Sequence, residues 1–178
     1  GMAITLGLIV IANGNVYKFK RIAAWLNPDA YAASDSWQLL HGQFALADGG
    51  LLGRGFGQST EKWGGLPAPH TDFILPVIAQ ELGVVGTAMV LVPLFTLIAV
   101  AFLIARDARD QFELTVASGI AIWLSIQTLV NLGGITGFLP ITGVPLPFVS
   151  YGGSSLVPLL IAIGILLGIA RHNSIESQ

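Results

Sequence analysis

The polar side chains best suited to chemistry gather in residues 54–72. In chain order they are Arg54, Lys62, His70, Thr71 and Asp72. A carboxylate such as Asp72 can act as a general base and remove a proton from a hydroxyl group. Cations nearby in the sequence can offset the charge of a pyrophosphate leaving group. The alternative is structural, because the helix dipole favours an acidic residue in a first turn. These residues alone favour neither interpretation.

The segment after the prolines at 67 and 69 predicts the start of a helix. We expect Thr71 to cap a helix that begins near Asp72. Glu81 follows nine residues after Asp72, which is about 13 Å of rise and roughly half a turn of rotation on one helix. The two carboxylates therefore cannot act as a pair there. We expect Glu81 to face the bundle interior and to hydrogen-bond within it.

The glycine-rich run at 49–59 has a different spacing from a nucleotide-binding loop. It lacks the Gly-x-Gly-x-x-Gly pattern, and no Gly-Lys-Ser/Thr follows it. Two interpretations stay open. It is a flexible loop leaving a membrane helix, or a backbone that a phosphate-bearing ligand can approach closely.

Gln127 and Asn131 lie four residues apart and so share one helix face. We expect their amides to hydrogen-bond between helices, with the lining of a ligand groove as the alternative. Gly164 and Gly168 have the spacing of a helix-packing motif. The histidines are scattered and cysteine is absent, so these residues predict no metal site. The three histidines are His41, His70 and His172.

The composition restricts the class of protein. Of 178 residues only 10% are charged, 53% are hydrophobic, and the mean hydropathy is +0.75. A soluble domain is about 25% charged, and a chain this apolar does not stay disordered. The net charge of −2 gives no field for nucleic acid, so we expect no nucleic-acid partner. The sequence therefore predicts an all-α, polytopic transmembrane helix bundle.

The uncharged stretches predict where the chain crosses the membrane. Between Glu113 and Arg171 lie 57 residues without a formal charge, far more than one span of about 20 residues requires. Glycines and prolines near 134–150 mark the return, and Pro93 predicts a kink in the preceding span. We expect a single membrane domain, 1–178, with these parts: the end of a truncated helix 1–12, a cytoplasmic loop 13–33, helix 34–48, an extracellular loop 49–72, helix 73–105, a cytoplasmic loop 106–113, helix 114–133, an extracellular Gly/Pro loop 134–150, helix 151–170 and a cytoplasmic tail 171–178.

Basic residues predict the sidedness. If helix 34–48 crosses, six of the eight basic residues fall on one side, which is the positive-inside pattern. The alternative is that residues 36–47 form a re-entrant helix. With the crossing, both Gly/Pro-rich segments face outward, where irregular backbone indicates a site. A cysteine replacing Ser59 should then react with an impermeant reagent from outside.

Several motifs resemble the SEDS family of shape, elongation, division and sporulation proteins, which includes the FtsW and RodA branches. They follow one another in order from Tyr17 to Arg171. The motifs are Gly53-x-Gly55-x-Gly57-Gln58-Ser59-x-x-Lys62, Leu66-Pro67-x-x-His70-Thr71-Asp72-Phe73-Ile74, Glu81-Leu82-Gly83-x-x-Gly86, Gln127-x-x-x-Asn131-x-Gly133 and the run from Leu139 to Ser155. The pairs Gly42-Gln43 and Lys62-Trp63 resemble the division branch slightly more than the elongation branch.

The resemblance implies a ten-helix fold, of which this chain would hold the end of helix 6 and helices 7–10. It implies polymerisation of lipid II into peptidoglycan glycan strands at the outer face of the bacterial cytoplasmic membrane, in cell division or cell-shape maintenance. Asp72 occupies the position of the family's essential aspartate, and Lys62 and Arg54 would steady the pyrophosphate. The other implied substrate-binding residues are His70, Thr71, Gln127, Asn131, Ser150, Tyr151, Gly152, Gly153 and Ser154.

The resemblance also implies partners and a cofactor. The partners are lipid II, the undecaprenyl-pyrophosphate-linked glycan, a class B penicillin-binding protein acting as transpeptidase, and other divisome or elongation-complex membrane proteins. A divalent cation, Mg or Mn, is implied as well. Ala68 and Gln80 stand where the family usually has acids, and His41 where it usually has glutamine. The alanine puts a cation site in this loop in doubt.

Two other functions remain as alternatives. One is a flippase for lipid-linked precursors, in which Gly/Pro-broken segments line a path. The other is a scaffold for a class B penicillin-binding protein. A transporter should carry its ionisable residues near the midplane, whereas here they crowd one mouth, which favours chemistry at the surface. Because a half-bundle leaves one face uncovered, we expect the 178-residue chain alone to be inactive.

Overall fold

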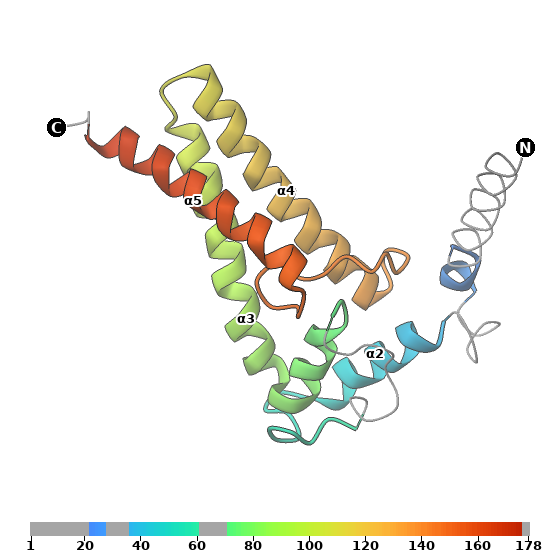
Figure 1. The fold of residues 1–178 in the computed structure, drawn as a ribbon. Helices are drawn as coiled ribbons and strands as arrows, with labels where there is room; N and C mark the ends of the chain where they lie inside the picture. The colour runs from blue at the N-terminus through green and yellow to red at the C-terminus, as the bar shows by residue number, and fades with distance from the viewer. Residues whose placement is uncertain (1–21, 28–35, 61–70, 176–178) are drawn as a thin grey trace, which may run out of the picture.

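The chain folds as a bundle of helices. The structure, a computed structural model, describes residues 22–27, 36–60 and 71–175. Its helices are α2 (Trp37–Asp48), α3 (Ile74–Arg106), α4 (Gln111–Thr136) and α5 (Gly153–Ile175), and residues 22–26 are also helical (Figure 1). The described residues contain no strand. The predicted all-α polytopic fold is confirmed.

Three helices are long and apolar enough to cross a membrane, within α3, α4 and α5. They run side by side in Figure 1 and pack through a core that includes Leu94, Leu124 and Leu159. A second cluster lies towards the 106–111 connection and includes Ala101, Ala105, Ala117 and Ala121. Such small residues let helix backbones approach closely. The protein is therefore a multi-pass membrane protein.

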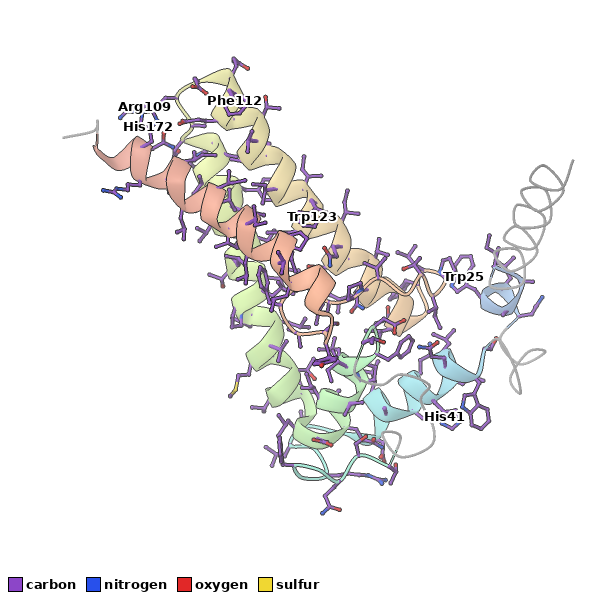
Figure 2. All side chains as sticks on the ribbon, viewed as in Figure 1. Trp25, His41, Arg109, Phe112, Trp123 and His172 are labelled. Carbon is purple, nitrogen blue, oxygen red and sulfur yellow. The ribbon has the colours of Figure 1, made fainter. Side chains whose placement is uncertain are left out.

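The two ends of the bundle differ in character. At one end lie Arg109, Phe112 and His172, while His41 of α2 lies at the other (Figure 2). Arg109 Nη2 donates to the carbonyl of Asn173 at 3.1 Å, and His172 Nδ1 is 2.7 Å from Glu113 Oε1. These contacts join the start of α4 to the end of α5. A Cβ added at Gly164 or Gly168 would meet no described atom within 4 Å. The two glycines therefore pack against no helix in the described part of the chain.

Gly83 interrupts α3. Its φ of 67° and ψ of −161° are non-helical, so a short segment, 74–82, meets the long segment, 84–106, at a sharp bend (Figure 1). The long segment rises about 34 Å, enough to cross the hydrocarbon core of about 30 Å. Pro93, where the sequence predicted a kink, stays within the helix. The kink at Pro93 stays a prediction.

The glycine-rich loop completes the backbone hydrogen bonds that the break at Gly83 leaves unmade. The amides of Arg54 and Gly55 donate to the carbonyls of Gln80 and Glu81 at 2.9 and 3.0 Å. On the other side of Gly83, the amides of Val84 and Val85 donate to the carbonyls of Gly50 and Leu51 at 3.0 and 3.3 Å. We call this arrangement, residues 49–55 against 80–85, the loop splice.

The loop splice explains the glycines at 53 and 83. A Cβ on Gly53 would overlap the carbonyl of Glu81, and a Cβ on Gly83 would overlap Gly53 N and Leu51 O. The backbone of this run does make a close approach, but to another part of the same chain. Because the amides of Arg54 and Gly55 already bind carbonyls, these two are not available for a phosphate group.

Helix α2 lies beside the short segment of α3. It has 12 residues, which rise about 18 Å, and it is not among the helices found long enough to cross. Its Gly42 packs against the ring of Phe73, and Gln43 Nε2 donates to the carbonyl of Thr136 at 3.1 Å. The crossing of 34–48, and the sidedness that depends on it, stays a prediction.

Candidate functional site

Asp72 lies in a turn just before α3, at the end of the bundle that carries α2. The helix begins at Ile74, Phe73 stands at the N-cap position, and no side chain caps it. The hydroxyl of Thr71 donates instead to Asp72 Oδ1 at 2.8 Å. The prediction that Thr71 is the N-cap was wrong, because its hydroxyl binds the neighbouring carboxylate. Phe73 is fully buried and anchors the turn, while Asp72 is only half-buried.

Asn131 of α4 ties this turn to the Gly/Pro segment 137–152. Its Nδ2 donates to the backbone carbonyl of Asp72 at 2.9 Å and to that of Val144 at 2.8 Å. One helical turn earlier, Gln127 Nε2 donates to the carbonyl of Pro145 at 2.9 Å. The expected bond between helices is thus a bond from helix to loop. The two amides hold irregular backbone beside Asp72.

A small cavity lies where these parts meet. It is bordered by Asp72, Phe73, Val130, Asn131, Gly134, Ile135 and residues 141–144, and its volume is about 10 Å³. Gly143 has a φ of 73°, and a Cβ there would lie 3.9 Å from Asp72 Oδ2. The carboxylate therefore faces the Gly/Pro segment. The two segments that the sequence placed on one face do lie side by side.

The predicted site residues 150–154 lie at the end of the Gly/Pro segment and at the start of α5. Ser150 Oγ accepts from the amide of Leu146 at 2.7 Å, which closes a tight turn. The carbonyl of Gly152 accepts from Ser155 Oγ at 2.8 Å where α5 begins. Tyr151 is 84% exposed. Gly153 is the first residue of α5, and the side chain of Ser154 lies outside the described part of the structure.

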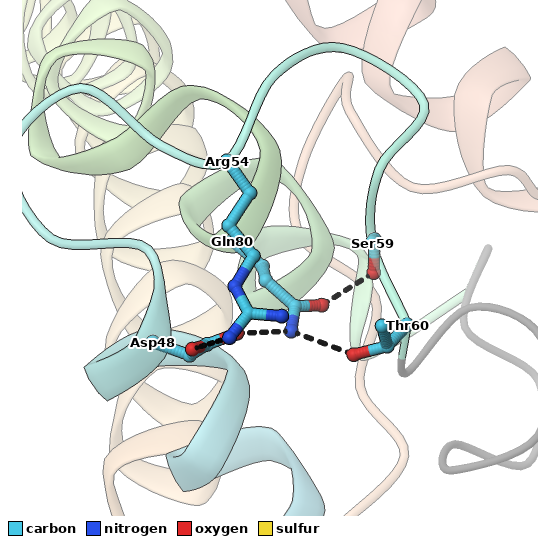
Figure 3. A network of polar contacts seen from close by, with 5 residues as sticks. All are labelled: Asp48, Arg54, Ser59, Thr60 and Gln80. Carbon is cyan, nitrogen blue, oxygen red and sulfur yellow. Dashed lines mark hydrogen bonds and ion pairs between the residues drawn. The ribbon is translucent and has the colours of Figure 1, made fainter.

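A second polar cluster surrounds Gln80, which is 1% exposed (Figure 3). Gln80 Nε2 donates to Asp48 Oδ2 at 2.8 Å and to Thr60 Oγ1 at 3.1 Å, and its Oε1 accepts from Ser59 Oγ at 2.6 Å. Asp48 also forms an ion pair with Arg54. A depression of about 440 Å³ opens beside it, lined by Phe44, Ala47, Asp48, Arg54, Thr60 and Gln80.

The structure does not bring Arg54 to Asp72. The amide of Arg54 binds the carbonyl of Gln80, which lies about 12 Å along the helix axis from Asp72. The guanidinium of Arg54 instead pairs with Asp48. Lys62 and His70, which the sequence also assigned to the site, fall outside the described residues. The described site is therefore Asp72, Thr71 and Asn131 with residues 141–144.

The fit of a metal ion can be tested on the described residues alone. They contain no group of three His, Cys, Asp or Glu side chains that could hold one. Gln80, at a position where an acid was expected, has its amide bound to Asp48, Ser59 and Thr60. These side chains therefore do not fit a metal centre. No pattern in the sequence indicates the role of Asp48, because its partner Gln80 is 32 residues away.

Comparison with known proteins places these features in a family. A family model described as "cell cycle protein" and named for FtsW, RodA and SpoVE matches residues 2–175. A probable peptidoglycan glycosyltransferase FtsW of Bacillus subtilis is 44% identical over 161 residues, covering 90% of this chain and 39% of the relative. The stage V sporulation protein E of the same organism is 39% identical over 97% of this chain and 46% of the relative.

A solved structure shows a similar fold. One chain of a peptidoglycan synthase complex, described as coordinating polymerization and crosslinking, superposes with a TM-score of 0.69 at 29% identity. The match covers 97% of this chain and 47% of that chain. This chain thus spans less than half the length of the relatives and the solved chain cited here.

Proposed function

The chain belongs to the FtsW, RodA and SpoVE family of cell cycle proteins, and from this membership we propose that it carries the reaction centre of a lipid II polymerase. The reaction is glycosyl transfer that builds peptidoglycan glycan strands, in cell division or in cell-shape maintenance. The observation that supports it best is the position of Asp72. Its half-buried carboxylate lies at the mouth of the membrane helices, beside a small cavity bordered by the Gly/Pro segment.

In the proposed step, Asp72 removes the proton from the 4-hydroxyl of the acceptor lipid II sugar. That oxygen forms a bond to the anomeric carbon of the growing strand. The bond from that carbon to the pyrophosphate oxygen breaks, and undecaprenyl pyrophosphate leaves with the electron pair. The hydrogen bond from Thr71 to Asp72 Oδ1 leaves Oδ2, which faces Gly143, to accept the proton.

The pyrophosphate needs cations, and we propose Lys62 and Arg54 for this role. Arg54 would have to exchange its partner Asp48 for the phosphate, since that ion pair holds its guanidinium in the structure. Tyr151, Gly152 and the neighbouring residues 150–154 would line the path of the sugar, together with His70. No step is assigned to a metal ion. A requirement for Mg or Mn is tested separately, by chelation and readdition.

We propose the cytoplasmic membrane of a bacterium as the location, with Asp72 on the outer face. The similarity to a chain of a peptidoglycan synthase complex supports a class B penicillin-binding protein as partner. A flippase is less well supported. The broken helix α3 is a feature of transporters, but the loop splice already binds the backbone groups freed at Gly83.

Replacement of Asp72 tests this function. Lipid II polymerisation by the intact protein in liposomes should fall at least about 100-fold in Asp72→Asn, because general-base catalysis contributes that much or more. Asp107→Asn, an exposed carboxylate at the opposite end, is the matched control and should keep the wild-type rate. Near-normal polymerisation by Asp72→Asn would remove Asp72 from the mechanism. If Asp72→Asn stops polymerisation, a pure flippase or scaffold is also excluded.

A further inference from the structure

The carboxamide of Asn131 has one polar atom that its known contacts do not use. Both hydrogen bonds that its nitrogen donates go to carbonyl oxygens, those of Asp72 and Val144. Since a carbonyl only accepts, the nitrogen must face them and the oxygen must face elsewhere. Asn131 is 4% exposed, and its buried Oδ1 has no hydrogen-bond partner among the described residues. Burying an acceptor without a partner costs about 1–3 kcal/mol.

The cavity beside Asp72 offers a place for the missing donor. Asn131 and Asp72 both border it, and its volume is about 10 Å³. To hold one water molecule, a cavity needs a volume of roughly 10–15 Å³ and two or more polar partners. A sugar ring is far too large for it. The group that fits is a single small hydroxyl-bearing molecule.

We propose that this cavity binds one water molecule, which donates one hydrogen to Asn131 Oδ1 and the other to the Asp72 carboxylate. Asn131 then acts as a positioning residue. It holds the backbone of Asp72 through its nitrogen and orients the carboxylate through the bound water. The proposal rests on the proposed function, because it concerns how Asp72 is set to receive a proton. It assigns to Asn131 a role distinct from contact with the substrate.

Two variants separate this role from a merely structural one. Asn131→Leu removes the acceptor and both donors and keeps the branched shape of the side chain. Gly134→Ala keeps Asn131 and adds a methyl group at the cavity border, where its Cβ would lie at ordinary contact distance, 3.7 Å from Ile141 Cα. The methyl group would displace the water without a clash. The matched control is Gly119→Ala, whose Cβ meets open space on the same helix.

The experiment measures kcat and KM for lipid II polymerisation by the intact protein. Asn131→Leu and Gly134→Ala should each lower kcat about tenfold or more while KM stays within about twofold, as for a group acting on the reaction step. The control Gly119→Ala should keep the wild-type kcat. A raised KM with unchanged kcat would mean that a substrate hydroxyl uses this acceptor, which overturns the proposal. So would an unchanged kcat in Gly134→Ala, which decides the matter if Asn131→Leu fails to fold.

Asp72→Asn separates failure of this inference from failure of the proposed function. If Asp72→Asn abolishes polymerisation while Gly134→Ala does not affect it, only the water-mediated role of Asn131 is lost. If Asp72→Asn is active, the catalytic role of Asp72 fails, and the role of Asn131 fails with it.

Discussion

At the scale of single residues, Gln80 shows how a buried amide can organise a loop. Its nitrogen and oxygen together bind side chains from the end of α2 and from the end of the described loop, at Asp48, Ser59 and Thr60. An acid at this position would meet Asp48 at hydrogen-bond distance with like charge. The glutamine is thus matched to Asp48, and the two positions should vary together.

Gln80→Leu tests the weight of this cluster. The change removes the hydrogen bonds that Gln80 makes to Asp48, Ser59 and Thr60, so the free energy of unfolding should fall by about 1–3 kcal/mol. The measurement is the unfolding equilibrium in mixed micelles of a mild detergent and a denaturing detergent. Gln58→Leu, the same substitution at an exposed position of the same loop, should change stability by less than about 0.5 kcal/mol. Equal effects of the two would show that the cluster contributes nothing.

The sequence predicted some of these residues and missed others for a physical reason. Asp72 and Asn131 stood out because a polar side chain in an apolar stretch needs a local explanation. Asp48 and Gln80 did not stand out, because their role is to hydrogen-bond each other and they lie 32 residues apart in the sequence. Arg54 was assigned to Asp72 because they share a loop, yet the loop splice holds it near the other end of a short helix.

At the scale of elements, the sequence predicted the long helices well. A helix was expected over 114–133, and α4 runs over Gln111–Thr136. The prediction succeeds because a helix in the lipid core needs a long apolar stretch, which the hydropathy of the sequence shows directly. The sequence predicted a kink at Pro93 but did not predict the break at Gly83. The sequence shows a glycine at position 83. The helix breaks there because a distant loop forms backbone hydrogen bonds with the residues on both sides of it.

Gly83→Ala should disrupt the loop splice. A Cβ at φ 67° and ψ −161° is strained, and it would overlap two backbone atoms of the loop. The free energy of unfolding should therefore fall by more than about 2 kcal/mol. Gly119→Ala, with open space around its Cβ, should alter it by no more than about 1 kcal/mol. Thermal unfolding in detergent measures the stability of both variants. If Gly83→Ala is as stable as the wild type, the loop splice does not contribute to stability as argued.

At the scale of the whole molecule, the arrangement of the bundle makes sidedness testable. Asp72 and the Gly/Pro segment lie at one end of the spans, and Arg109 and Phe112 at the other (Figure 2). Ser59, first expected to suit labelling from outside, is 1% exposed and bonded to Gln80. A cysteine there would be inaccessible whichever way the protein is inserted, so Gln58 is the better position.

Cysteines at Gln58 and Phe112 should label from opposite sides. Both residues are exposed and the chain has no cysteine of its own. In intact cells, Gln58→Cys should react with an impermeant maleimide, whereas Phe112→Cys should react only after the membrane is opened. The physical reason is the excess of basic residues on the Phe112 side. The reverse pattern would place Asp72 in the cytoplasm and exclude polymerisation at the outer face.

The loop splice has a consequence for how the family can vary in length. Two hydrogen bonds on each side of Gly83 pair residues 50–51 with 84–85 and residues 54–55 with 80–81. One residue inserted between Leu51 and Arg54 would shift one of these pairs out of register and leave buried amides or carbonyls without partners. Insertions and deletions should therefore be absent between these positions in related sequences. A short stretch of surface loop would then be as fixed in length as a membrane span.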